Sequence, residues 1–282
     1  MRKKLPIFLL VCGVLLFTIC TNINVNAQSV ELSDFDKALQ TYLNSVEDYK
    51  KEHADYVLAK SQYERYQTLS SQNAAFEETL QMLEARDQVI IDYLISLKEK
   101  ILMTPSLEEN MIDEAIAKLD QSIGWFSDHK TRLPSAGNLQ DLSEDSTTAS
   151  EKYVELMPLI YESLSLPAYG LVTDYESRLE NLHTGLKDKL DKINKEEREE
   201  YQLNNNKLQL MDKWLLESEL RFVRSEEKRV MARQLINDLS NLKKVDYRSF
   251  ENIITRILES RQHLKDSLNF MNEILREIKT TE

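Results

Sequence analysis

The chain has 282 residues, 30% of them charged and 41% hydrophobic, and its 48 acidic residues outnumber 36 basic ones for a net charge of −12. An acidic chain of this kind repels phosphate backbones, so nucleic acid is excluded as the main partner. Five glycines and five prolines fall far below the roughly 12% of average usage, which excludes a sheet with many turns and favours a few long helices.

The first 27 residues have the pattern of a secretory signal peptide. A basic start, Met1–Lys4, precedes the uncharged apolar residues 5–20, and residues 25–27 end in the small Ala27 that signal peptidase accepts before its cut. We therefore expect cleavage after Ala27. The apolar segment is shorter than the roughly 20 residues that span a bilayer, so an uncleaved N-terminal membrane anchor is the less favoured alternative.

Removal of this segment changes the composition of what remains, Gln28 to Glu282. Both cysteines, Cys12 and Cys20, lie within the removed segment. Disulfides, thiolate nucleophiles and cysteine metal sites are therefore excluded from the exported chain. Three basic residues and no acidic one leave with the segment, so 33 basic residues remain beside 48 acidic ones, a net charge of −15.

Apolar residues that alternate three and four positions apart predict three helices within residues 28–133, the N-terminal bundle segment. We expect the polar stretch Ser70–Asn73 to end the first helix and Pro105 to end the second. Ser106, with Glu109 three residues later, is predicted to cap the third helix. The predicted helix-packing residues of the first two helices are Phe35, Leu39, Tyr42, Tyr49, Tyr56, Phe76, Leu80, Ile90 and Leu94.

Residues 134–150 form a polar connector, in which residues 143–150 could be a loop or a weak helix, and the C-terminal segment 151–282 follows. Within it, residues 156–172 carry a single charge together with Pro158 and Pro167, which should kink or interrupt a helix. We interpret this stretch as a kinked helix or a helical hairpin buried against the bundle. The alternative is an apolar segment that contacts a membrane or a protein partner. Its candidate contact residues are Leu159, Ile160, Leu164, Leu166, Tyr169 and Leu171.

Two long coiled-coil helices are predicted near the C-terminus, the first over about residues 207–242 and the second after a short break at 243–246. The apolar residues of the first are Met211, Trp214, Leu215, Leu216, Leu220, Val223, Val230, Leu235 and Leu239. The packing residues of the second are Phe250, Ile254, Ile257, Leu264, Leu268, Met271 and Leu275. Together the patterns predict an all-α fold, an elongated antiparallel helical bundle or coiled coil of five to six long helices.

Candidate chemical sites are few. Tyrosines recur at every seventh position from Tyr42 to Tyr63 and could contact a ligand, but amphipathic packing explains them better. Glu180 and His183 match one Glu-x-x-His element of di-iron bundles, yet no second element occurs, so we interpret His183 as a surface histidine. No glycine-rich phosphate loop or glycine-flanked serine appears. The sequence therefore predicts no catalytic, metal-binding or cofactor-binding residue, and no cofactor.

These inferences favour a non-enzymatic protein exported to the periplasm, the cell envelope or the extracellular space. We expect an interaction or scaffolding component that binds a protein partner, or a second copy of itself, through coiled-coil faces. The alternative is a membrane-active helical protein that engages lipid through residues 156–172. Membrane contact is the less favoured of the two, because this stretch is shorter and less continuous than a spanning helix requires.

Overall fold

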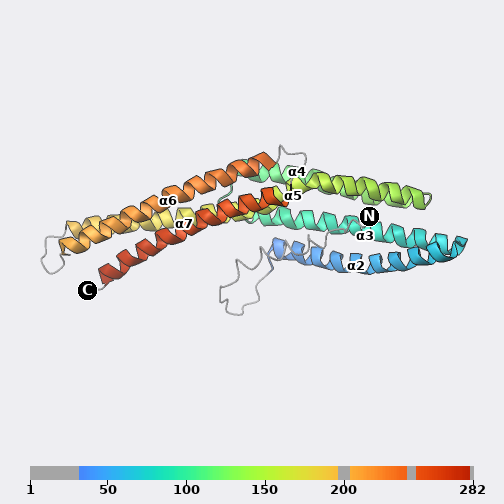
Figure 1. The fold of residues 1–282 in the computed structure, drawn as a ribbon, viewed down its shortest axis with the longest axis horizontal. Coiled ribbons are helices and arrows are strands. Elements are labelled where there is room, and N and C mark those ends of the chain that lie inside the picture. The colour runs from blue at the N-terminus through green and yellow to red at the C-terminus, as the bar shows by residue number, and fades with distance from the viewer. Residues whose placement is uncertain (1–31, 196–203, 240–245, 280–282) are drawn as a thin grey trace. The chain divides into compact units, whose positions relative to one another are not determined.

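The computed structural model of the chain describes residues 32–195, 204–239 and 246–279 (Figure 1). These residues contain six α-helices, one short 3-10 helix and no strand, so the all-α prediction is confirmed. The predicted signal peptide, residues 1–27, lies outside the described part of the chain. The elements are α2 (Asp34–Tyr66), α3 (Leu69–Leu102), α4 (Glu109–Arg132), η2 (Leu133–Ser135), α5 (Leu139–Asn194), α6 (Asn205–Leu239) and α7 (Tyr247–Lys279).

Helix α5 is the element that the other helices share. Its 56 residues correspond to a length of about 84 Å. Near its start, Ser146 accepts a hydrogen bond from Arg86 of α3, whereas further along Glu176 pairs with Arg229 of α6. Helix α5 therefore packs against two groups of helices, α3 and α4 on the one hand and α6 and α7 on the other.

The first two described helices form an antiparallel hairpin, and α2 and α3 lie side by side in Figure 1. The rings of Tyr42 and Tyr93 have centroids 5.3 Å apart, and the Lys100 ammonium lies 4.8 Å from the centroid of the Phe35 ring. Residue numbers therefore rise along one helix as they fall along its neighbour, which is the antiparallel arrangement that the sequence predicts.

The turn between α2 and α3 lies at Gln67 and Thr68, so the prediction that Ser70–Asn73 ends the first helix is wrong. Gln67 adopts φ = 50°, in the left-handed region. The Thr68 hydroxyl then accepts a hydrogen bond from the Ser71 backbone N–H at 3.1 Å, and the Ser71 hydroxyl accepts one from the Thr68 N–H at 3.0 Å. Because this capping box satisfies the first backbone donors of α3, the polar residues begin a helix here and do not end one.

The turn between α3 and α4 includes Pro105, as predicted, but Ser106 does not cap α4. Ser106 has φ = 57°, and Glu108 precedes the helix without a side-chain capping bond, so that prediction is wrong. Close packing shapes this turn instead. A Cβ atom at Gly170 of α5 would lie 2.6 Å from Thr104 Cγ2 and 2.7 Å from the Pro105 carbonyl oxygen, closer than real Cβ contacts. The backbone of the turn is therefore pressed against α5.

Helix α5 continues without interruption through Pro158 and Pro167. It also includes residues 139–150, so the part of the polar connector that the sequence left open between loop and weak helix is helical. The side-chain oxygen of Asn138 accepts hydrogen bonds from the backbone N–H groups of the second and third residues of the helix, at 2.8 and 3.1 Å. This N-cap offsets the low helix propensity of the serines and threonines that follow.

Candidate functional site

The residues predicted to pack α2, α3 and α7 lie inside the chain's own helix pairs, and none of them is exposed. Those that are buried are Phe35, Leu94, Phe250, Ile257, Leu264 and Met271. Those that are half-buried are Leu39, Tyr42, Tyr49, Tyr56, Phe76, Leu80, Ile90, Ile254, Leu268 and Leu275. These faces therefore contact neighbouring helices of the same chain.

The repeated tyrosines of α2 belong to this internal packing. Tyr49 and Tyr56 lie against a hydrophobic cluster that includes Met82 and Leu83 of α3. His53 lies between the two tyrosines, with its ring centroid 5.7 Å from that of Tyr49 and 6.0 Å from that of Tyr56. The arrangement supports the packing interpretation of these aromatic residues over a ligand-contacting strip.

The α6–α7 interface contains buried serines that the apolar pattern did not reveal. The hydroxyls of Ser218 and Ser267 share a hydrogen bond of 2.8 Å, and those of Ser225 and Ser260 share another of 2.8 Å. All four residues are fully buried, so each hydroxyl is satisfied away from water. Since 218 pairs with 267 and 225 with 260, α6 and α7 run antiparallel, and their small residues let the two backbones approach closely.

The apolar stretch 156–172 lies in the middle of α5 and is largely covered. Its one charged residue, Glu162, is buried and accepts hydrogen bonds from the Lys118 ammonium of α4 at 3.0 and 3.2 Å. This ion pair offsets the cost of burying a carboxylate. Of the candidate contact residues, Ile160, Leu166 and Tyr169 are buried, Leu159 and Leu164 are half-buried, and Leu171 is exposed. Most of this stretch is therefore engaged inside the folded chain.

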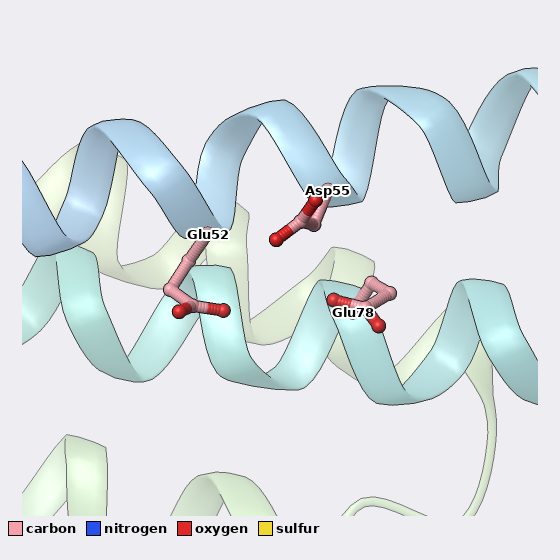
Figure 2. A group of neighbouring side chains, drawn as sticks. All are labelled: Glu52, Asp55 and Glu78. Atoms are coloured by element: carbon pink, nitrogen blue, oxygen red, sulfur yellow. The ribbon is translucent and has the colours of Figure 1, made fainter.

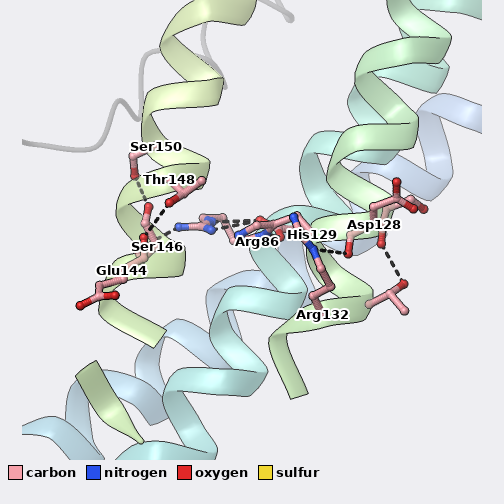
Figure 3. Close-up of polar contacts among 11 residues, drawn as sticks. Arg86, Asp128, His129, Arg132, Glu144, Ser146, Thr148 and Ser150 are labelled. Carbon is pink, nitrogen blue, oxygen red and sulfur yellow. Dashed lines mark hydrogen bonds and ion pairs between the residues drawn. The ribbon is translucent and has the colours of Figure 1, made fainter. Parts of the chain in front are cut away.

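A buried polar network links α3, α4 and α5. The Arg86 guanidinium donates to one Asp87 oxygen at 3.1 and 3.2 Å and to the Ser146 hydroxyl at 3.1 Å, as Figure 3 shows for the Arg86–Ser146 contact. The other Asp87 oxygen lies 2.5 Å from His129 Nδ1, and Trp125 stacks on the His129 ring with centroids 5.1 Å apart.

An aspartate–histidine pair can activate a hydroxyl that contacts the free imidazole nitrogen. Here His129 Nε2 is buried without a hydrogen-bond partner, and the hydroxyl of Ser146 contacts Arg86. The network therefore connects three helices by hydrogen bonds and ion pairs and has a structural role. Removal of one member would leave a buried charge unpaired, which is strongly destabilising.

One group of carboxylates among the described residues could hold a cation. Glu52 and Asp55 of α2 face Glu78 of α3 across the hairpin, with ligand oxygens within 4.8 Å of one another (Figure 2). Oxygen ligands of this kind suit calcium or magnesium. Asp55 is exposed, and exposed acidic groups are common without a bound ion, so the cluster alone indicates no metal function.

The prediction that His183 is a surface histidine is wrong, because the residue lies in the interface between α5 and α6. Its ring is buried, with Nε2 3.4 Å from the Leu215 carbonyl oxygen. The Phe222 ring meets it edge to face, with centroids 5.6 Å apart. His183 therefore orients α6 on α5.

Ion pairs also fix the rotation of α6. The Arg229 guanidinium lies 2.6 Å from the Glu176 carboxylate and donates to the Tyr169 hydroxyl at 3.3 Å. Burial raises the pKa of Glu176, although the charge of Arg229 acts in the opposite direction. Arg233 pairs with Glu108 in the turn before α4. These contacts hold one face of α6 inward, so the opposite face is directed to solvent.

That opposite face carries large apolar side chains. Each is between 44% and 57% exposed. At about 100° per residue they lie about half a turn around the helix from the buried Ser218 and Ser225. Exposed apolar patches with a regular order are typical of interaction sites. We call this set the outer stripe of α6, and it consists of Leu216, Leu220, Val223, Val230 and Met231.

Two exposed charges continue the four-three spacing of the outer stripe. Lys213 precedes Leu216 by three residues, and Glu227 lies between Val223 and Val230. The stripe is therefore basic at its start and acidic towards its end. A partner helix would need an apolar face and charges in the complementary order.

The outer stripe is thus the candidate functional site, a helix face suited to binding and not to chemistry. Among the described residues, no helix combines the length and the apolar character that a membrane-spanning segment needs. In comparisons with known proteins, the chain matches no protein-family model, and no curated protein or solved structure shows significant similarity to it.

Proposed function

We propose that the protein is an exported, non-enzymatic interaction or scaffolding component of the cell envelope or extracellular space, which holds a helical partner on the outer stripe of α6. The observation that carries the proposal is the position of this stripe. Four of its side chains are exposed at coiled-coil spacing, with Met231 beside them, on a helix whose inner face is already filled. A second helix laid along the stripe would bury it as a coiled-coil seam.

The size of the stripe sets a requirement on the partner. Complete burial of an exposed aliphatic side chain contributes about 1.5–3 kcal/mol, so covering five that are half-covered already contributes roughly 4–7 kcal/mol. Association costs about 4–15 kcal/mol in lost freedom of motion. The stripe alone therefore cannot hold a partner tightly. The partner must bring its own apolar face and charges complementary to Lys213 and Glu227.

A photo-crosslinking amino acid in place of Val223 tests the proposal directly. Illumination in the native envelope or medium should join the chain to a protein, and a Leu220→Glu substitution in the same chain should remove the adduct. The matched control carries the crosslinker at Leu58, which is also exposed but lies on α2. Equal adducts from both positions, or an adduct that survives Leu220→Glu, would refute binding at the stripe.

Export has its own test. The intact mass of the protein recovered outside the cytoplasm should correspond to a chain that starts at Gln28. A protein found in the membrane fraction with residues 1–27 still attached would support the uncleaved anchor and contradict the cleaved signal peptide.

The competing proposal is lipid binding through residues 156–172. It would require α5 to release Ile160, Leu166 and Tyr169 from burial. Flotation of the protein with liposomes checks it, and recovery in the bottom fraction would leave partner binding as the proposal.

A further inference from the structure

We infer that the helix held on the outer stripe of α6 belongs to a second copy of the same chain, paired antiparallel with the first. This inference rests on the proposed function, because it names the partner of the same surface. It comes from the order of charges along the stripe, which is complementary to itself when one copy is reversed but not when two copies lie parallel and in register.

The two charges within the stripe decide the orientation. In an antiparallel pair that places Leu220 of one copy beside Val223 of the other, Lys213 lies next to Val230 and within about one turn of Glu227 of the second copy. Each copy then supplies the opposite charge to the other. In a parallel pair in register, Glu227 would face Glu227 and Lys213 would face Lys213. Like charges at the centre of a seam are far more costly than charges at its rim.

The rim of the stripe is consistent with the same register. Glu217 of one copy lies beside Arg224 of the other, and symmetry produces this pair twice. The unfavourable rim contact is between Glu219 and Glu226 and also occurs twice, but both residues are exposed, where solvent and salt weaken their repulsion. The antiparallel pairing therefore gives attraction at the centre and at one rim.

The small size of the stripe predicts a reversible dimer. Five side chains per copy form a smaller patch than the roughly 800 Å² per partner of a standard stable interface. We therefore expect monomer and dimer to interconvert as the concentration changes.

Analytical ultracentrifugation tests the inference. The sample is the protein purified from the cells that naturally produce it, measured over a hundredfold range of concentration. The average mass should rise from monomer to dimer with concentration. Leu220→Glu combined with Val223→Glu should raise the dissociation constant at least tenfold, with an unchanged circular dichroism spectrum, because both positions are exposed. The control Leu58→Glu, at a leucine of α2 that is even more exposed, should leave the dissociation constant unchanged. A dimer that withstands the double substitution would overturn the inference.

Charge exchange tests the orientation. Lys213→Glu and Glu227→Lys should each weaken the dimer by about threefold to tenfold, and the combined exchange should restore it. If the copies pair in parallel, neither single exchange has this effect, and the antiparallel inference fails.

The outcomes for the two proposals differ. A protein that stays monomeric at every concentration overturns self-pairing. If Val223 then still crosslinks to a different protein in a Leu220-dependent way, the proposed function stands without it. If the crosslink is also absent, both are refuted.

Discussion

In this protein the position of a helix can depend on one side chain, or on a glycine that has none. Gly170 is the clearest case, since the turn between α3 and α4 occupies the space of a side chain at this position. Gly185, in the same helix α5, has no atom within 4 Å of its ideal Cβ position outside its own helix backbone and chain neighbours. The two glycines thus share a helix and differ in what surrounds them.

The Gly170→Ala substitution should lower the free energy of unfolding by about 1–3 kcal/mol, because the new methyl group meets the Pro105 carbonyl oxygen and the Thr104 side chain. The matched Gly185→Ala substitution should raise it by up to about 1 kcal/mol, since alanine favours the helix and meets nothing. Urea unfolding of both variants measures the difference. Equal effects of the two substitutions would show that the close approach at Gly170 carries no energetic weight.

His263 of α7 predicts a dependence of stability on pH. Burial lowers the pKa of its imidazole, and the nearby cations Arg221, Arg224 and Lys228 lower it further, against the opposite effect of Asp266. In the unfolded chain the imidazole takes up a proton near pH 6.5, whereas in the folded chain it does so only at lower pH. The stabilisation is thus complete above pH 6.5 and is lost as the pH falls towards the folded-state pKa.

The expected result is that the free energy of unfolding falls more between pH 7.5 and pH 5.5 in the natural protein than in a His263→Gln variant, in the same urea experiment. Glutamine does not titrate, so the difference between the two curves isolates this group. Parallel curves would mean that the imidazole has the same pKa in both states.

At the scale of elements, α7 shows what an apolar period can and cannot decide. A column of one residue in seven, from Phe250 to Met271, is predicted from the sequence and is buried. The same pattern predicts a second buried column of residues such as Ile254 and Leu268, which are only half-buried. The fully buried neighbours are Ile253, Ser260, Ser267 and Ile274. Serine reads as polar in a hydrophobicity pattern, so a hydroxyl pair that satisfies itself across an interface is invisible to that pattern.

The outer stripe was hidden for the opposite reason. Leu216 and Leu220 are apolar, so the sequence counted them with inward residues such as Met211. Two columns of residues with the same spacing run along α6. One consists of large apolar side chains, and the other includes the small side chains of Ser218 and Ser225. Only contacts with α7 show which column is inside. The sequence did reveal the all-α fold and its antiparallel helices, because these depend on periodicity, residue type and short connections.

The serine pairs predict non-additive energetics. Ser225→Ala alone should cost about 1–3 kcal/mol, because Ser260 loses its partner in a dry interface. Ser225→Ala combined with Ser260→Ala should cost less than the sum of the two single substitutions, since no unpaired hydroxyl remains. A double-mutant cycle by urea unfolding measures this coupling. Additive effects would show that each hydroxyl has another way to be satisfied.

At the scale of the whole chain, the central part of α5 is the common support. Around Gly170 it meets the turn before α4, and around Glu176 it meets α6. Charged residues along it, such as Glu162, are paired with neighbouring helices. Local opening of this part would require both helix sets to separate from it at once.

Amide hydrogen exchange should therefore be slowest in residues 160–176 of α5 and faster towards its end near residue 190, as is usual for a helix terminus. Mass spectrometry of peptic fragments after timed labelling measures the order. Uniform exchange along α5 would mean that the helix opens as one unit.

Because α5 packs against both groups of helices, it also limits where the coding sequence can be divided into separately folding parts. A chain divided within residues 156–172 would leave part of α5 with α3 and α4 and the rest with α6 and α7. Neither fragment would then contain all the residues of its hydrophobic core. Two such fragments, produced separately, should be recovered only together. Any rearrangement of this coding sequence that inherits one bundle whole must therefore also carry most of α5.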